Sequence, residues 1–342
     1  MTSQATELPF AHGGPPLRGT LRATHADFFV DEELGFAADG AGEHVFVRVE
    51  KNGANTDWVA RELAKFAGID AGAVSYAGMK DRHAVTRQTF SLHLPGKREE
   101  PDWLALVHHE FHVVEARRHS RKLQRGALKS NFFRLVVRNV NGDRERAEHV
   151  LAAIARDGVP NFFGEQRFGR EGGNVARARA MFAGRRVQRH ERSLLLSAAR
   201  SQLFNAVLAQ RVERGDWNRA IEGDVWMLAG TQSIFGPEPA SPELDARVAS
   251  GDISPTGPLW GSGVPRSAGV AAEIETAAAA AHADLAAGLV HADMRQERRA
   301  LVLRLDELRH MWLPGDDLQL EFRLRSGSYA TVVIRELLAD AA

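Results

Sequence analysis

The chain contains 342 residues, of which 44% are hydrophobic and 26% are charged, a composition typical of a soluble globular protein large enough for two domains. It has no cysteine, which excludes disulfides and thiolate metal sites. Its 44 basic and 44 acidic residues cancel, so any surface for nucleic acid has to be local rather than a property of the whole chain.

The first part of the chain alternates strand-like and helical patterns. Segment 43–50 is rich in β-branched residues and predicts a strand, and Thr56 is a suitable N-cap for a helix that ends at Gly68. The face of this helix that is expected to be buried carries Val59, Leu63 and Phe66. The other elements expected before Gly158 are strands at 88–94, 111–115 and 131–138 and a helix at 144–157.

The composition changes after residue 158. Residues 161–300 are mainly helical in pattern, with expected helices at 193–210 and 270–290 separated by a loop at 232–268 that is rich in Pro, Gly and Ser. Strand patterns return at 301–305 and 318–324, and a last helix is expected at 331–338. The order predicts an α+β fold in which a mostly helical domain is inserted into a sheet domain built from both ends of the chain.

One acidic residue stands in an unusual setting. Asp81 lies between Lys80 and Arg82, shortly after a glycine that permits a tight turn. Two flanking cations favour the ionised carboxylate, which is suited to act as a nucleophile or a general base. Lys80 is the expected partner of this carboxylate, and Arg82 is the alternative. For this tripeptide alone, a charged surface turn without a catalytic role is the other interpretation.

Seven segments, in order along nearly the whole chain, resemble those of the TruD-type tRNA pseudouridine synthases. The strongest are YAGMKDRHAVTRQ at 76–88 and HSRKLQRGALKSNFF at 119–133. The others are ADFFVDEELGF at 26–36, GEHVFVRVEKNGANT at 42–56, GVPNFFGEQRFG at 158–169, LSAARSQLFN at 196–205 and SGSYATVVIREL at 326–337. One short match arises easily by chance, whereas seven in order do not.

This resemblance implies a pseudouridine synthase domain with a mixed, mainly antiparallel sheet, formed by residues 1–157 and 305–342, and a mostly helical TruD-type insertion at 158–304. It implies isomerisation of uridine to pseudouridine in tRNA, typically at position 13, by base flipping and without a metal or organic cofactor. The expected partner is tRNA alone, with no obligate protein partner, so a monomer is expected. The N-terminus lacks a signal-peptide pattern and no apolar run approaches the ~20 residues that span a bilayer, so we expect a cytoplasmic protein without membrane contact.

The resemblance also implies roles for individual residues. The expected catalytic residues are Asp81, as nucleophile, and Lys80, in support; the expected substrate contacts are Phe28, Asn131, Phe133 and Tyr329. The reaction breaks the bond from N1 to C1′ and joins C5 to C1′ without oxidation or hydrolysis. A carboxylate that adds to the sugar or the base, or that removes a sugar proton, is sufficient, and the sequence does not choose between these schemes.

Residue spacing supports one of these pairs independently. Asn131 and Phe133 are two residues apart on a predicted strand, so their side chains share a face. One can form a hydrogen bond with a base while the other stacks on it, and an asparagine on an apolar face needs a partner. For each phenylalanine alone, plain core packing is the alternative. Two basic runs, 117–125 and 185–192, are expected to contact RNA phosphates, or else to form solvated surface.

A histidine cluster supports the main rival function. His108, His109 and His112, with Glu110 among them, could hold a metal and would then indicate a metal-dependent hydrolase. The following valines favour a strand here, and the spacing His-Glu-x-x-His is absent, so a surface histidine cluster is the preferred interpretation. A non-catalytic RNA-binding protein is the remaining alternative.

Overall fold

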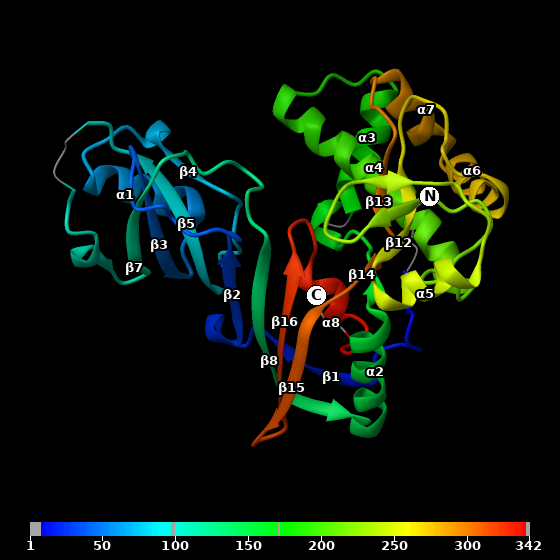
Figure 1. Cartoon of the computed structure of the whole chain (residues 1–342), viewed down its shortest axis with the longest axis horizontal. Helices are drawn as coiled ribbons and strands as arrows, with labels where there is room; N and C mark the ends of the chain where they lie inside the picture. The colour runs from blue at the N-terminus through cyan, green and yellow to red at the C-terminus, as the bar shows by residue number, and fades with distance from the viewer. Residues whose placement is uncertain (1–7, 97–99, 170–171, 340–342) are drawn as a thin grey trace.

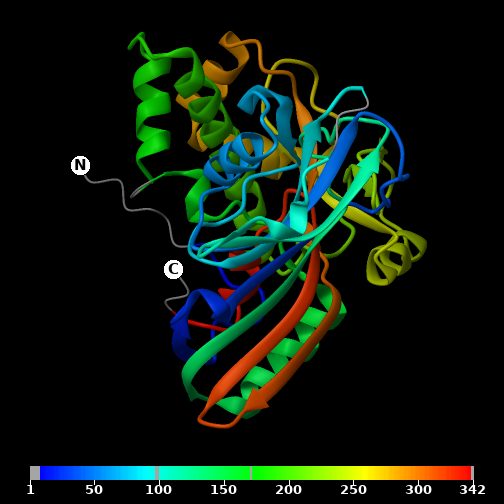
Figure 2. The ribbon, with the colours of Figure 1, turned by 90° about the vertical axis from the view of Figure 1, so that its left-hand side faces the viewer.

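A computed structural model describes residues 8–96, 100–169 and 172–339. A long twisted sheet runs through the molecule, with α1 at one end and a largely helical region beside the other end (Figures 1 and 2). Within the described residues, no helix combines the length and the apolar character that crossing a lipid bilayer requires.

The large sheet contains ten strands in the order β15-β16-β8-β2-β5-β3-β7-β6, with β1 beside β8 and β4 beside β5. Its strands are β1 (Leu17–Leu21), β2 (Phe28–Glu33), β3 (His44–Asn52), β4 (Val74–Tyr76), β5 (Val85–His93), β6 (Val107–His108), β7 (Phe111–His119), β8 (Ser130–Gly142), β15 (Asp306–Leu313) and β16 (Asp317–Arg325). Strand β2 runs parallel to β5, and the other strand pairs of the described sheet are antiparallel. The prediction of a mixed, mainly antiparallel sheet is therefore confirmed.

Segments from opposite ends of the chain meet at the centre of this sheet. Strand β16 pairs with β8, so that Leu324 lies opposite Asn131 and Phe322 lies opposite Phe133. Strand β2 pairs with β8 on its other side. The alternating apolar residues of β8 and β16 explain this position, because each strand buries one face against the common core.

Two helices next to the sheet were predicted closely. Helix α1 (Thr56–Phe66) buries Val59 and Leu63 in one cluster with residues of β3 and β5. Its N-cap is Asn55 rather than Thr56, because the Asn55 side chain accepts a hydrogen bond from the backbone N–H of Asp57. Phe66, which was also expected to be buried, is the last residue of the helix and is 38% exposed. Helix α2 (Arg144–Asp157) begins after the N-cap Asp143 and ends at a glycine with positive φ, as its pattern predicts.

The remaining elements lie mostly between residues 158 and 305. They are β9 (Val159–Pro160), α3 (Gly173–Phe182), α4 (Arg189–Glu213), β10 (Trp226–Leu228), β11 (Ile234–Phe235), α5 (Pro242–Ser250), β12 (Ile253–Leu259), α6 (Gly269–Ala281), α7 (Ala283–His291), β13 (Glu297–Ala300) and β14 (Val302–Leu303), followed near the C-terminus by α8 (Ala330–Ile334). Short 3₁₀ turns occur at His25–Asp27, Ala71–Ala73, Trp103–Ala105 and Glu165–Arg167. Strands β9 and β14 pair with each other where the chain enters and leaves this region.

The prediction of a loop at 232–268 is wrong, because this segment contains β11, α5 and β12. These strands belong to a four-stranded sheet in the order β11-β10-β12-β13, so the region is less purely helical than the sequence predicted. The prolines of β12 argued against a strand, because proline has no backbone N–H to donate to a neighbouring strand. The carbonyl of Pro255 nevertheless accepts a hydrogen bond from Leu301, which keeps the strand paired.

The C-terminal elements also differ in detail from their predictions. The Ala-rich segment forms two helices that are interrupted at His282, and α8 ends at Ile334 instead of residue 338. The strand expected at 301–305 is the short β14. One apolar core nevertheless joins the large sheet to the inserted region, since Phe162 and Phe204 belong to the same buried cluster as Phe133.

Candidate active site

The turn between β4 and β5 holds Asp81 by both its backbone and its side chain. The backbone N–H of His83 donates to Oδ1 of Asp81 at 2.9 Å. The ammonium of Lys51 donates to the backbone carbonyl of Asp81 at 3.0 Å. The Asp81 side chain keeps 29% of its surface exposed, so the carboxylate is fixed in place and still accessible.

The ionic partner of Asp81 is Arg22, which sequence reasoning missed. Nη2 of Arg22 lies 2.9 Å from Oδ2 of Asp81, and the guanidinium lies over the ring of Phe28 with Cζ 4.0 Å from the ring centre. Arg22 follows β1 with a positive φ of 61°, a strained conformation for a residue other than glycine. No local pattern marks this residue, because its contact with Asp81 exists only once β1 has paired with β8.

The two neighbours of Asp81 have other partners. Nζ of Lys80 lies 2.8 Å from a carboxylate oxygen of Glu32, and both side chains are almost completely buried. Nε of Arg82 donates to the carbonyl of Gly53 at 3.1 Å. The expectation that Lys80 pairs with Asp81 is therefore corrected: Lys80 faces the sheet, where the Glu32 carboxylate needs a buried counter-charge.

Lys51 is a buried cation beneath the Asp81 turn. Its side chain is fully buried, and Nζ also donates to the carbonyl of Ala54 at 2.8 Å. Burial lowers the pKa of Lys51 to about 8, the charge of Asp81 opposes this shift, and the charge of Lys80 adds to it. Lys51 thus links the Asp81 turn to the segment that leads into α1.

Replacing Lys51 by methionine tests this burial through the pH dependence of stability. Because the pKa of Lys51 is about 8 in the folded chain and 10.5 for an ordinary lysine, the unfolded chain binds more protons between these values. The contribution of Lys51 to the free energy of unfolding therefore rises with pH in this window, by up to about 1.4 kcal/mol per pH unit. In urea denaturation from about pH 7 to 10, the free energy of unfolding of wild type should rise relative to that of Lys51→Met. A constant difference would contradict a buried ammonium.

Phe28, Asn131 and Phe133 lie on one face of the sheet. Val30 of β2 stands opposite Phe133, and Glu32 stands opposite Asn131, so these side chains project to the same side. The rings of Phe28 and Phe133 are 6.3 Å apart and nearly perpendicular, and both are more than 90% buried. Oδ1 of Asn131 is buried without a hydrogen-bond donor among the described residues.

Tyr329 is connected to the inserted region. It immediately precedes α8, and its hydroxyl accepts from Nη2 of Arg167 at 3.0 Å. Arg299 lies nearby, over the ring of Phe163 at 4.2 Å, and burial lowers the pKa of its guanidinium to about 10. Sequence reasoning also missed these two arginines, although Arg167 lies within the segment 158–169 that resembles the family.

The histidine cluster forms a surface hairpin turn between β6 and β7. Ligand atoms of His108, His109 and Glu110 lie within 4.8 Å of one another, whereas His112 is outside this group. His109 is 79% exposed, and the His108 ring stacks on Phe111 with centres 5.3 Å apart. The strand predicted at 111–115 is confirmed as β7. Exposed acidic groups are common without a metal.

Both basic runs are exposed over most of their length. Arg121 and Lys122 lie in the connection from β7 to β8, and the described residues offer neither of them a carboxylate partner. The run 185–192 covers the start of α4 and the turn before it, and its arginines are likewise exposed. These surfaces carry positive charge that is available to a polyanion.

The comparisons with known proteins agree along the whole chain. The family described as tRNA pseudouridine synthase D (TruD) matches residues 8–177 and 174–337. The tRNA pseudouridine synthase D of Xanthomonas axonopodis pv. citri (strain 306) is 50% identical, over 99% of this chain and 97% of the relative. That of Aeromonas salmonicida (strain A449) is 49% identical, over 97% of this chain and 94% of the relative.

A solved structure shares the fold. The crystal structure of the putative tRNA pseudouridine synthase D (TruD) from Methanosarcina mazei matches with a TM-score of 0.74 and 22% identity. The match covers 96% of this chain and 95% of that chain. The large sheet and the inserted region therefore occur together in another protein.

Proposed function

This chain belongs to the TruD family of tRNA pseudouridine synthases, and we infer from this membership that it is an isomerase that converts uridine to pseudouridine in tRNA. The match of the family across residues 8–337 carries this conclusion. Neither the hydrolase nor the non-catalytic alternative receives comparable support. We propose that the modified uridine is at position 13 of the tRNA.

We propose that Asp81 is the catalytic carboxylate. Its Oδ1 is fixed by the N–H of His83 and its Oδ2 by Arg22, while part of the side chain remains accessible to a substrate. Isomerisation detaches uracil from C1′ and reattaches it through C5, with one proton leaving C5 and one proton bound at N1. An ionised carboxylate can add to the sugar or the base, or remove a sugar proton, and each scheme requires the same oriented group.

We propose that the face formed by Phe28, Asn131 and Phe133 receives the flipped uracil. The imide N–H of uracil is a suitable donor for the buried Oδ1 of Asn131, to which no described residue donates a hydrogen bond. The two rings supply the apolar surface that replaces base stacking. Arg22 lies against Phe28 and Asp81 at once, which supports a site at their junction.

Tyr329 is the proposed aromatic neighbour of the same base. It follows β16, whose Leu324 lies opposite Asn131, so the chain leads from the proposed base contact to this ring. The hydrogen bond from Arg167 fixes the tyrosine ring toward the inserted region. We propose that residues 158–304 form an insertion domain, which the pairing of β9 with β14 at its two ends supports.

The basic runs 117–125 and 185–192 are proposed to bind the tRNA backbone from the sheet and from the insertion. Their exposed arginines and lysines release counterions when they contact phosphates. Lys80 is proposed to support catalysis indirectly, by holding the Asp81 turn against Glu32. The enzyme is expected to act in the cytoplasm as a monomer, with tRNA as its only partner.

Incubation with two tRNA transcripts tests the reaction and its position. One transcript carries uridine at position 13, and the other carries cytidine there and is otherwise identical. We expect pseudouridine at position 13 of the first transcript and none in the second, measured by nuclease digestion and mass spectrometry. Equal pseudouridine in both transcripts would contradict position 13, and none in either would contradict the reaction itself.

A further inference from the structure

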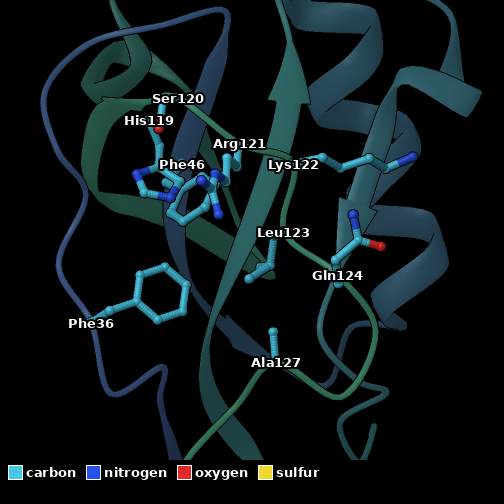
Figure 3. A pocket seen from close by; sticks show the side chains of 9 residues that line it. All are labelled: Phe36, Phe46, His119, Ser120, Arg121, Lys122, Leu123, Gln124 and Ala127. Atoms are coloured by element: carbon cyan, nitrogen blue, oxygen red, sulfur yellow. The ribbon is translucent and has the colours of Figure 1, made fainter.

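A pocket that the proposed reaction does not use lies beside the connection from β7 to β8. Its volume is about 450 Å³. The residues that line it include Phe36, Phe46, His119, Arg121, Leu123 and Ala127. Figure 3 shows the rings of Phe36, Phe46 and His119 on one side of this connection and the side chain of Lys122 extending to the other side.

The rings of Phe36, His119 and Phe46 contact one another, and the Phe36 ring is exposed. The ring centres of Phe46 and His119 are 4.5 Å apart, and those of Phe36 and His119 are 5.6 Å apart at an angle of 32°. Phe46 is buried, but Phe36 is 47% exposed although it occupies an ordered turn after β2. A large exposed aromatic side chain in a pocket is typical of a binding surface.

Arg121 brings positive charge to the border of these rings. Arg121 and Lys122 are exposed, and the described part of the chain gives neither of them an ion pair. The acidic neighbour, Asp39, lies 3.4 Å from Nδ1 of His119 and accepts hydrogen bonds from the backbone and the hydroxyl of Ser120, which lower the pKa of its carboxyl to about 2. Asp39 is therefore an anion that faces His119, and among the described residues Arg121 and Lys122 have no ion pair with it. Aromatic rings beside free cations match the chemistry of a nucleotide, which has a flat base and a phosphate.

The pocket is also close to the proposed catalytic face. Phe36 follows Glu32 by four residues, so their Cα atoms are at most about 15 Å apart. The chain is held there by a hydrogen bond of 2.8 Å from Lys129 to Glu33, at the end of β8 that carries Asn131. An RNA strand bound on the face that carries Glu32 and Asn131 can therefore extend to this pocket.

We propose that this pocket binds a second, unpaired nucleotide of the same tRNA, whose base stacks on Phe36 and His119 and whose phosphate pairs with Arg121. This inference rests on the proposed function, because it takes tRNA as the ligand. Every base has a π-face, so the pocket selects an unstacked nucleotide rather than a particular base. It contributes affinity and orientation for tRNA and takes no part in breaking the glycosidic bond.

Substitution of Phe36 tests the stacking contact. Phe36→Leu keeps an apolar side chain and removes the ring, whereas Phe36→Trp keeps a ring. We expect Phe36→Leu to raise the dissociation constant for an unmodified tRNA transcript by about 5- to 20-fold, with Phe36→Trp close to wild type. The single-turnover rate at saturating tRNA should not change. Phe66→Leu, an exposed phenylalanine at the end of α1, is the matched control and should bind like wild type.

Ultraviolet crosslinking of wild type to the same transcript gives a direct measurement. We expect an RNA adduct on the peptide that contains Phe36, and loss of this adduct in Phe36→Leu. Unchanged affinity in Phe36→Leu would overturn the proposal, whether or not the single-turnover rate at saturation drops. If wild type makes no pseudouridine but the affinity still falls in Phe36→Leu, the proposed reaction fails and this RNA contact stands.

Discussion

Pseudouridine formation should fall by on the order of 10³-fold or more when Asp81 is replaced by asparagine, while binding of tRNA is retained. The amide has nearly the size of the carboxylate and can still accept the hydrogen bond from the N–H of His83. It carries no charge, so it can neither attack carbon nor remove a proton at a useful rate. The measurement compares single-turnover product formation with the dissociation constant for the same transcript.

A matched substitution separates this effect from a general loss of negative charge. Asp316 lies in the turn between β15 and β16, is exposed and pairs with Arg144. Its positive φ of 59° suits asparagine as well as aspartate. We expect Asp316→Asn to retain full activity. Equal rates for wild type and Asp81→Asn would refute the catalytic role of Asp81.

Loss of Lys80 should destabilise the protein strongly. Lys80→Met leaves the carboxylate of Glu32 buried without its counter-charge, which we expect to cost about 3–5 kcal/mol of unfolding free energy. Adding Glu32→Gln removes the stranded charge, so the double variant should regain part of that loss. Urea denaturation of the two single variants and the double variant gives the coupling energy of the pair.

The same cycle distinguishes two roles of Lys80. If Lys80→Met unfolds like wild type and yet loses catalysis, Lys80 serves Asp81 directly, and the ion pair with Glu32 is unimportant. Lys65→Met is the matched control, because Lys65 is exposed near the end of α1. We expect Lys65→Met to change the free energy of unfolding by less than about 0.5 kcal/mol.

Sequence periodicity predicted the elements that depend on local burial. The alternation at 131–138 and 318–324 predicted β8 and β16, and the helical spacing at 144–157 predicted α2 within its observed limits. These segments carry one apolar face each, which leaves little choice of structure. The second sheet was not predicted, because β10 and β11 are two or three residues long and prolines interrupt β12.

The ion pairs of Asp81 and Lys80 could not be predicted from the sequence, because they form only in the tertiary structure. Adjacency in the chain suggested Lys80 and Arg82, but side chains next to each other in a turn point in different directions. Arg22 reaches Asp81 from the position after β1, and Glu32 reaches Lys80 from β2. One sequence contains no local pattern for such pairs, since each is created by the order of strands in the sheet.

The pairing of β8 with β16 has a consequence for how this chain is made. At about 5–20 residues per second, a ribosome needs roughly 10–35 s to proceed from Gly142 at the end of β8 to Asp317 at the start of β16. During this interval β8 lacks its pairing with β16, so one edge of β8 is open beside Phe133. The nascent chain therefore completes the sheet around Phe133 last, and it is most prone to aggregation while residues 143–316 are being synthesised.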